Sequence, residues 1–586
     1  MKLIRILLVF LTVLPLLAAG AGAKKPRAFS GTTDAKIKIE GNFLLLPMKG
    51  NEDYNKISLA DEDGNVLFKV SALLTDETPQ WFAPINVSQF KGKELTLTYQ
   101  KSGREPSFRQ VDEIGFRDHS RDRGRPTFHL TSKDGYMGDI CGLVRSGGKW
   151  HAFFLYNPFA MNGQPPYSVA HAVSEDLINW TYEPNFMPYE VVDGGGTVYP
   201  TGGDAFFDKG NKSGLFDTEN GAFLVLEKSD GSTWLAPLSG GLNVKLSGVG
   251  GRSLGGPSVF YDGASKQWVL VKCVENGKVK RVDFYVSPNL SDWKYASGFD
   301  ADFPSPTICK MSASGNDEDS KYVLWSGDGR YFVGNFDGSK FSTDFAEPQR
   351  VLFGDVKSAR FWRNAPDNRN IVAARVDQPG DLMRTVGQAF SQSMGTPWDV
   401  RLADTKQGYR MRVSLPTEIV AHMGQGSDGL GLPSMAFRSN VFMLPDAVGN
   451  NFIVVLTFDT RLLDGFSIRA GVAKFGYSKG GKYFETTRIE DVKHIQPFPD
   501  GLPDAPTSAM VVLDNYSAEL FFQDGSAVVM MGDSYLNPEQ KIKVGCNGEM
   551  VIYRVTKIPV LPTTEAQRAA AARELMKAAE TPKKAE

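Results

Sequence analysis

Histidine and cysteine are scarce in this chain, and their scarcity excludes several kinds of chemistry. Among 586 residues only six are histidine and four are cysteine. No C-x-x-C pair and no H-E-x-x-H pair occurs, so neither a zinc site nor a thioredoxin-like redox site is predicted. The phosphate-binding loop, the dinucleotide fingerprint and the G-x-S-x-G nucleophile motif are missing as well. We therefore expect neither a metal nor a cofactor.

The four cysteines, at positions 141, 273, 309 and 546, lie far apart in the sequence. An oxidising compartment would permit disulfides, and four cysteines allow three pairings. Buried free thiols are the favoured interpretation.

An excess of charge is also missing. The chain has 65 basic and 67 acidic residues, so the electrostatic attraction that holds proteins on nucleic acid is not expected. The apolar run at residues 6–17 is shorter than the ~20 residues of a membrane-spanning helix. A basic start before it and the A-x-A pattern at Ala21–Ala23 predict a signal peptide over residues 1–23. We expect a mature chain that begins near Lys24, has no membrane span, and is secreted, periplasmic or on the cell surface.

Helical periodicity is nearly absent before residue 563. Short runs rich in aromatic and β-branched residues dominate instead, each bounded by Gly, Asp, Asn or Ser, as in WHAFFLY, WVLVKCV and FIVVLTF. After the breaker Pro562, the Ala-rich residues 563–586 predict a tail that is disordered or forms a short helix. The fold class predicted for the rest is all-β.

One internal repeat indicates the architecture. AVSEDLINW (172–180) and YVSPNLSDW (285–293) share a strand end, a Ser, a turn with Asp or Asn, a Leu and a closing Trp. GNFDGSKF (334–341) has a related form. Repeated antiparallel units of this type predict a β-propeller.

The order of the motifs resembles glycoside hydrolase family 32, the levanases, inulinases and invertases. The matching segments are FHLTSKDGYMGDICGL, LYNP, HAVSEDLINW, LGGPSVF and LPTEIVAHM. The resemblance implies a five-bladed propeller over residues 126–412 and a C-terminal β-sandwich over residues 430–560. Residues 27–125 resemble a small β domain that often precedes bacterial levanases. The partner implied is a carbohydrate, a fructan or another glycan.

The catalytic motifs of the family are only partly present. Where the first motif has W-M-N-D-P-N-G, this chain has YMGDICG, so Asp139 keeps the nucleophile position while Gly138 and Cys141 replace two asparagines. The second motif, R-D-P, aligns on LGGPSVF, and Gly256 replaces the stabilising Asp. The third, E-C-P, puts Pro304 in the place of the acid/base Glu. A retaining glycosidase needs two carboxyl groups about 5–5.5 Å apart, and loss of the acid costs ~10²–10⁴ in rate.

Several nearby residues are candidates for the altered site. Substrate contacts are expected from Tyr136, Cys141, Leu155, which replaces a Gln of the family, and Arg252. Asp204 is the best candidate for a recruited acid, ahead of Glu275, Asp300 and Asp302, which are more typical of solvated turns. Cys141 as a nucleophile is disfavoured because no His is predictably placed to activate it. Replacing Gly255, Gly256 and Pro304 by Arg, Asp and Glu is predicted to bring back weak fructosidase activity.

Three functions stay open at this point. The chain is a glycan-binding pseudoenzyme, or an active glycosidase or transferase that uses Asp139 with a recruited acid, or a structural or adhesion protein. Asp139 itself also suits a turn residue that caps backbone amides. A second carboxylate within about 6 Å of Asp139 in a pocket would favour the enzyme.

Overall fold

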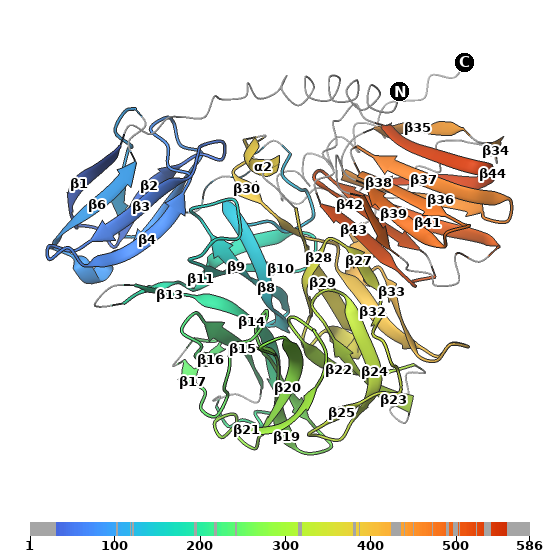
Figure 1. Ribbon diagram of the computed structural model, residues 1–586, viewed down its shortest axis with the longest axis horizontal. Coiled ribbons are helices and arrows are strands. Elements are labelled where there is room, and N and C mark those ends of the chain that lie inside the picture. The colour runs from blue at the N-terminus through green and yellow to red at the C-terminus, as the bar shows by residue number, and fades with distance from the viewer. Residues whose placement is uncertain are drawn as a thin grey trace, which may run out of the picture.

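Strands organise the whole described chain into three β assemblies in succession (Figure 1). The computed structural model describes residues 31–559 apart from short internal stretches, the longest of which are 423–434 and 533–540. The predicted signal peptide and the predicted helical tail lie outside the described residues, and the domain boundaries given above stay predictions. Within the described part of the chain, no helix has the length and apolar character needed to cross a membrane.

The first assembly packs two antiparallel sheets, with orders β1-β6-β3-β4 and β5-β2-β7. Burial alternates along its strands, so one face of each sheet enters a shared core. Its strands are β1 (Thr32–Lys38), β2 (Phe43–Met48), β3 (Asn55–Ala60), β4 (Val66–Ala72), β5 (Trp81–Asn86), β6 (Glu94–Gln100) and β7 (Arg109–Val111).

The second assembly is the expected five-bladed propeller, in which each blade is an antiparallel sheet with strands in sequence order. Blade I has β8 (Gly135–Ser146), β9 (Lys149–Asn157), β10 (Ser168–Ser174) and β11 (Trp180–Met187), and blade II has β14 (Pro200–Lys209), β15 (Asn220–Lys228), β16 (Thr233–Pro237) and β17 (Val244–Lys245). Blade III has β18 (Ser258–Asp262), β19 (Gln267–Asn276), β20 (Val279–Ser287) and β21 (Lys294–Phe299), and blade IV has β22 (Thr307–Ser312), β23 (Ser320–Trp325), β24 (Arg330–Phe336) and β25 (Phe341–Ser342). Blade V has β28 (Val356–Phe361), β29 (Asn370–Val376), β32 (Trp398–Ala403) and β33 (Arg410–Ser414).

Short strands and helices lie in the connections of the propeller. They are the hairpin β12 (Glu190–Val191) and β13 (Thr197–Val198), the short strands β26 (Gln349–Arg350), β27 (Leu352–Gly354), β30 (Phe390–Ser391) and β31 (Ser393–Met394), and the helices α2 (Leu382–Thr385) and α3 (Thr417–His422). The apolar strands of each blade are covered on both faces. Three apolar clusters lie between blades I and II, II and III, and III and IV, and a larger cluster joins blades IV, V and I.

The internal repeat occupies equivalent places in different blades, as predicted. In blade I the turn between the third and fourth strands has Asp176 accepting from the amide of Asn179 at 2.7 Å. In blade III Asn289 accepts from the amide of Asp292 at 3.0 Å in the same turn. Both turns hold a leucine in the left-handed region, Leu177 at φ 64° and Leu290 at φ 65°. The shared motif therefore encodes one turn geometry.

The third assembly is a β-sandwich built around the long strand β44 (Lys541–Pro559), which pairs with both sheets. Its other strands are β34 (Met435–Arg438), β35 (Val441–Val448), β36 (Asn451–Asp459), β37 (Leu463–Ala470), β38 (Ala473–Ser478), β39 (Tyr483–Thr487), β40 (Val492–Ile495), β41 (Pro506–Asp514), β42 (Ser517–Phe522) and β43 (Val528–Gly532). Strand β27 leaves the propeller and pairs parallel with β43, which ties the two assemblies together.

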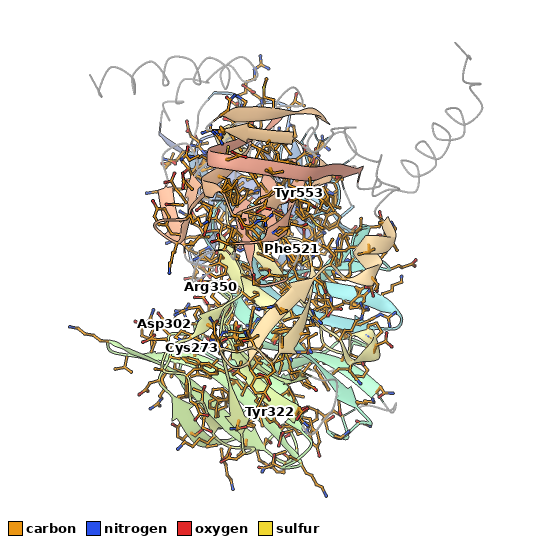
Figure 2. All side chains as sticks on the ribbon, turned by 90° about the vertical axis from the view of Figure 1, so that its right-hand side faces the viewer. Cys273, Asp302, Tyr322, Arg350, Phe521 and Tyr553 are labelled. Carbon is orange, nitrogen blue, oxygen red and sulfur yellow. The ribbon has the colours of Figure 1, made fainter. Side chains whose placement is uncertain are left out.

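The propeller and the sandwich meet through aromatic and buried polar side chains. Phe521, which Figure 2 places at the junction, lies 4.8 Å from the ring of Trp398 in blade V. The buried His129 has Nε2 3.4 Å from Oε1 of Glu519 and Nδ1 3.6 Å from Oδ2 of Asp514. Burial raises the pKa of Glu519 to about 7, above its ordinary 4.5.

This junction predicts a pH-dependent stability difference between the wild type and Glu519→Gln. Because the folded pKa is raised, the native state holds the proton of Glu519 more tightly, and the stability it confers is lost as pH rises from about 4.5 to about 7. The wild type should therefore lose about 2–3 kcal/mol relative to Glu519→Gln over that window. His129 and Asp514 are present in both proteins, so the comparison isolates Glu519 together with its coupling to these two neighbours. Urea unfolding at several pH values measures the difference, and parallel profiles would contradict the prediction.

Candidate functional site

Asp139 lies on the innermost strand of blade I and is paired with an arginine. Its carboxylate is 3.2 Å from Nη2 of Arg375, and its side chain is 35% exposed. The ladder between β8 and β9 is irregular on both sides of Ile140, so a bulge sets the direction of this segment. The predicted nucleophile position therefore carries a partly exposed, ion-paired carboxylate.

Arg375 brings a second carboxylate to Asp139. From β29 in blade V, its Nη1 donates to Oδ1 of Asp377 at 2.7 Å and to Oε1 of Gln392 at 3.1 Å. Its guanidinium also lies 5.8 Å from the ring centre of Tyr136, within reach of a cation–π contact. We name Tyr136, Asp139, Arg375 and Asp377 the Asp139 cluster.

Arg375 and Asp377 were not among the site residues predicted from the sequence. A signal was present, because the buried run IVAARV of β29 contains one charged residue and is followed directly by an acid. A charge inside such a strand requires a partner nearby.

Asp204, the predicted recruited acid, is not in the Asp139 cluster. It is completely buried on the inner strand of blade II, 2.9 Å from Nη2 of Arg363 and 3.6 Å from Nη1 of Arg360. With no exposed atom, its carboxylate is not placed to exchange a proton with a substrate. Its role in this structure is that of a buried counter-charge.

Arg360 fills the space between the inner strands of the propeller. It is completely buried on β28 of blade V. Its Nη2 donates to the carbonyl oxygens of Gly255 at 2.9 Å and Gly256 at 3.4 Å, and its Nη1 to those of Ser305 at 3.2 Å and Pro306 at 3.3 Å. With Asp204 from blade II, this one side chain links segments from four blades. We name Asp204, Gly255, Gly256, Ser305 and Arg360 the axial plug.

The two glycines aligned with the family's second motif have no room for side chains. Gly255 and Gly256 have φ of +78° and +85°, a region that favours glycine. A Cβ on Gly256 would lie 2.0 Å from the backbone nitrogen of Gly203, and one on Gly255 would lie 2.0 Å from Oγ of Ser305. Pro304 is partly buried, and its carbonyl accepts from the amide of Gly327 at 2.7 Å. Backbone at Gly256 and the Ser305 side chain at Gly255 therefore oppose the return of activity expected of the triple variant, which stays a prediction.

The expected substrate contacts are only partly accessible. Cys141 and Leu155 are buried in the apolar cluster between blades I and II, and burial raises the pKa of the Cys141 thiol well above its ordinary range. Leu155 also explains Gly138, since a Cβ there would lie 2.8 Å from Cβ of Leu155. Arg252 is exposed in the segment ahead of blade III. Of the four expected contact residues, only Tyr136 belongs to the Asp139 cluster.

The remaining candidates are surface or packing residues. Glu275, Asp300 and Asp302 are exposed, and Asp302 is 3.0 Å from Nζ of Lys280.

All four cysteines are free and buried. Over the described ranges, no group of three or more His, Cys, Asp or Glu side chains is arranged to hold a metal ion.

Comparison with known proteins agrees with this architecture. Residues 129–412 match the model of the glycosyl hydrolases family 32 N-terminal domain. A levanase of Bacillus subtilis is 25% identical over 69% of this chain and 65% of its own length, and an invertase of Schizosaccharomyces pombe is 28% identical over 42% and 48%. The matches thus span about half to just under two thirds of these curated relatives.

Solved structures show the same fold. The exo-inulinase of Aspergillus awamori superposes with a TM-score of 0.63 at 18% identity, covering 76% of this chain and all of that chain. Fructan 1-exohydrolase IIa of Cichorium intybus gives a TM-score of 0.57 at 15% identity. Motif order, blade topology and the family match lead to one conclusion: the propeller, over residues 129–412, is a glycoside hydrolase family 32 domain.

Proposed function

We propose that this protein is an exported glycan-binding member of family 32 that recognises fructans or related neutral glycans at the Asp139 cluster and does not hydrolyse them. The observation that carries the proposal is the axial plug. Backbone and the buried Arg360 fill the space where a carboxylate at Gly256 would act, so Asp139 lacks the partners that the family's chemistry requires.

The Asp139 cluster suits the binding of sugar hydroxyls. Its two carboxylates accept hydrogen bonds, while the buried Arg375 and Tyr136 lie behind them and hold them in place. Both carboxylates are about one third exposed, so a ligand can reach them. Relatives named levanase and extracellular exo-inulinase support a fructan as the first ligand to test and export as the expected location.

A rearranged glycosidase is the second candidate, favoured by the two carboxylates that share Arg375. In that function Asp139 attacks the sugar and Asp377 supplies the proton. A general acid is usually set in a dry, apolar pocket, however, and Asp377 is 33% exposed and already ion-paired at 2.7 Å. The geometry therefore supports binding better than turnover.

Calorimetric titration of the whole protein with levan, inulin and sucrose tests the proposal. We expect saturable binding of at least one of them and an affinity about ten- to a hundredfold lower for Asp139→Asn, because hydrogen bonds to a charged group contribute about 1.5–3 kcal/mol. Glu418→Gln is the matched control, since Glu418 forms an ion pair with Arg369 at 2.6 Å beyond the last strand of blade V. Equal affinities for the wild type and Asp139→Asn would reject the Asp139 cluster as the binding site.

A further inference from the structure

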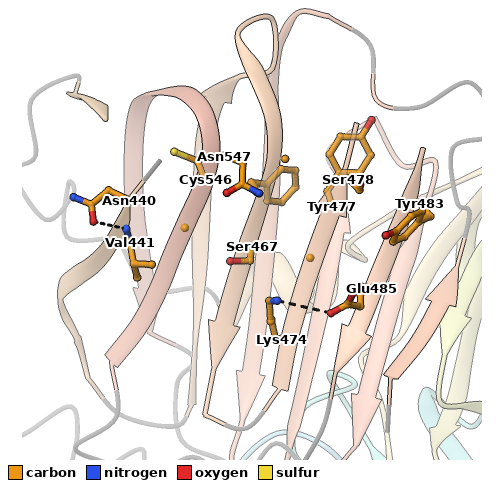
Figure 3. A pocket seen from close by; sticks show the side chains of 14 residues that line it. Asn440, Val441, Ser467, Lys474, Tyr477, Ser478, Tyr483, Glu485, Cys546 and Asn547 are labelled. Carbon is orange, nitrogen blue, oxygen red and sulfur yellow. Dashed lines mark hydrogen bonds and ion pairs between the residues drawn. The ribbon is translucent and has the colours of Figure 1, made fainter. Parts of the chain in front are cut away.

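The sandwich carries a cavity of about 390 Å³ on its outer face, far from the Asp139 cluster in sequence. It crosses strands β35, β44, β37, β38 and β39, which lie side by side (Figure 3). Small-molecule sites typically occupy roughly 300–1,000 Å³, so this volume fits a short ligand. We name this cavity the sandwich trench.

Glycines and serines form the floor of the trench. In one cross-strand row Gly545 pairs with Ser467, which pairs with Gly476, which pairs with Glu485. The neighbouring row brings together Asn547, Gly465, Ser478 and Tyr483. Side chains on alternate positions of a strand share a face, so all of these residues point to the same side of the sheet. The near absence of side chains at the centre of these rows creates the depression.

The walls of the trench are polar but electrically balanced. Lys474 and Glu485 lie on one side, with their charged atoms 3.8 Å apart and both side chains 33% exposed (Figure 3). Asn547, Ser467 and Ser478 supply an amide and two hydroxyl groups. Tyr483 lines one end with a partly buried ring. Amides, hydroxyls and a balanced ion pair offer donors and acceptors without a net charge to attract an ion.

We infer that the sandwich trench is a second binding site, for a short stretch of a neutral oligosaccharide. A sugar ring has apolar CH groups that pack on an aromatic ring and hydroxyls that need several donors and acceptors at once. Tyr483 supplies the aromatic ring. The Asn547 amide, the Ser467 and Ser478 hydroxyls and the Lys474–Glu485 pair supply the hydrogen-bond donors and acceptors. The site shares its ligand class with the proposed function but uses none of the same residues.

Gly476→Trp tests the trench directly. A Cβ on Gly476 has its nearest neighbour at 3.7 Å, an ordinary contact, so the indole fills the trench without strain on the backbone. Gly263→Trp is the matched control, because Gly263 lies in a blade III turn with nothing within 4 Å of its Cβ. Both variants are made in the Asp139→Asn background, which weakens binding at the propeller about ten- to a hundredfold, so that the two sites separate in affinity. The full-length proteins are titrated with fragments of levan and inulin, xylo- and cello-oligosaccharides, and polygalacturonate as a charged probe.

We expect the Asp139→Asn protein to retain saturable binding of a neutral oligosaccharide. Gly476→Trp should weaken that binding at least tenfold, and Gly263→Trp should leave it unchanged. Tyr483→Ala should also weaken that binding. If Gly476→Trp does not fold, unchanged binding by Tyr483→Ala would overturn the inference. Equal binding by Gly476→Trp and Gly263→Trp, binding of polygalacturonate alone, or no binding of any neutral fragment in the Asp139→Asn background would overturn the inference. Loss of binding through Asp139→Asn alone would instead support only the propeller site.

Discussion

Arg360→Met is expected to destabilise the propeller by about 3–5 kcal/mol, the usual result of breaking a buried ion pair by removing one partner. The substitution removes a completely buried cation 3.6 Å from the completely buried Asp204, which is left with Arg363, at 2.9 Å, as its one remaining cation among those described. It also removes the donor to four backbone carbonyls in blades III and IV. Methionine has a similar length but donates no hydrogen bond. The four carbonyl oxygens therefore lose their donor in a buried place.

Tryptophan fluorescence during urea unfolding measures this effect selectively. All tryptophans except Trp81 lie between Trp150 and Trp398, within the propeller, and the sandwich sequence has none. Arg438→Met is the control, because Arg438 pairs with Glu549 in the sandwich while its side chain is 81% exposed. Exposed pairs contribute about 0–1 kcal/mol, so the control should unfold close to the wild type. A change below 1 kcal/mol for Arg360→Met would show that the axial plug is not a structural centre.

Gly256→Asp, the substitution that reinstates the family's carboxylate, should lower the stability of the propeller by about 3 kcal/mol or more and restore no activity. A left-handed conformation costs a residue with a Cβ about 1–2 kcal/mol, and overpacking adds about 1–3 kcal/mol. Here the Cβ would meet backbone nitrogen at 2.0 Å, and backbone has little freedom to move aside.

Gly263→Asp separates this clash from the effect of an added charge. It places the same side chain in the same blade, in a turn where the new Cβ meets nothing within 4 Å. Its unfolding midpoint in urea should stay near that of the wild type. A stable Gly256→Asp protein that releases fructose would mean that the segment is able to open and that the plug is only one state of the site.

The all-β class and the propeller repeat were predictable because their signals are local, whereas the number of blades and the sandwich followed from the family resemblance. The turn motif ending in Trp180 and Trp293 sets the boundary between the third and fourth strands of a blade, and short apolar runs fill the inter-blade clusters. Such patterns depend on neighbours within about ten residues, which a sequence displays directly.

The site was less predictable because its contacts are not local. Asp139 was found from its motif, but its partner Arg375 is 236 positions away, and Arg360 reaches Gly255 across 105 positions. The sequence indicated that carboxylates were lost at Gly256 and Pro304. It did not indicate that the vacated space is filled, because closure depends on the packing of Gly203 against Gly256.

The proposed absence of hydrolysis is tested most directly by measuring the release of fructose from levan, inulin and sucrose by the purified wild-type protein, with Asp139→Asn measured beside it. We expect no release above the Asp139→Asn level while the wild type still binds a glycan in calorimetry. Efficient release by the wild type that Asp139→Asn abolishes would overturn the proposed function and assign catalysis to the Asp139 cluster.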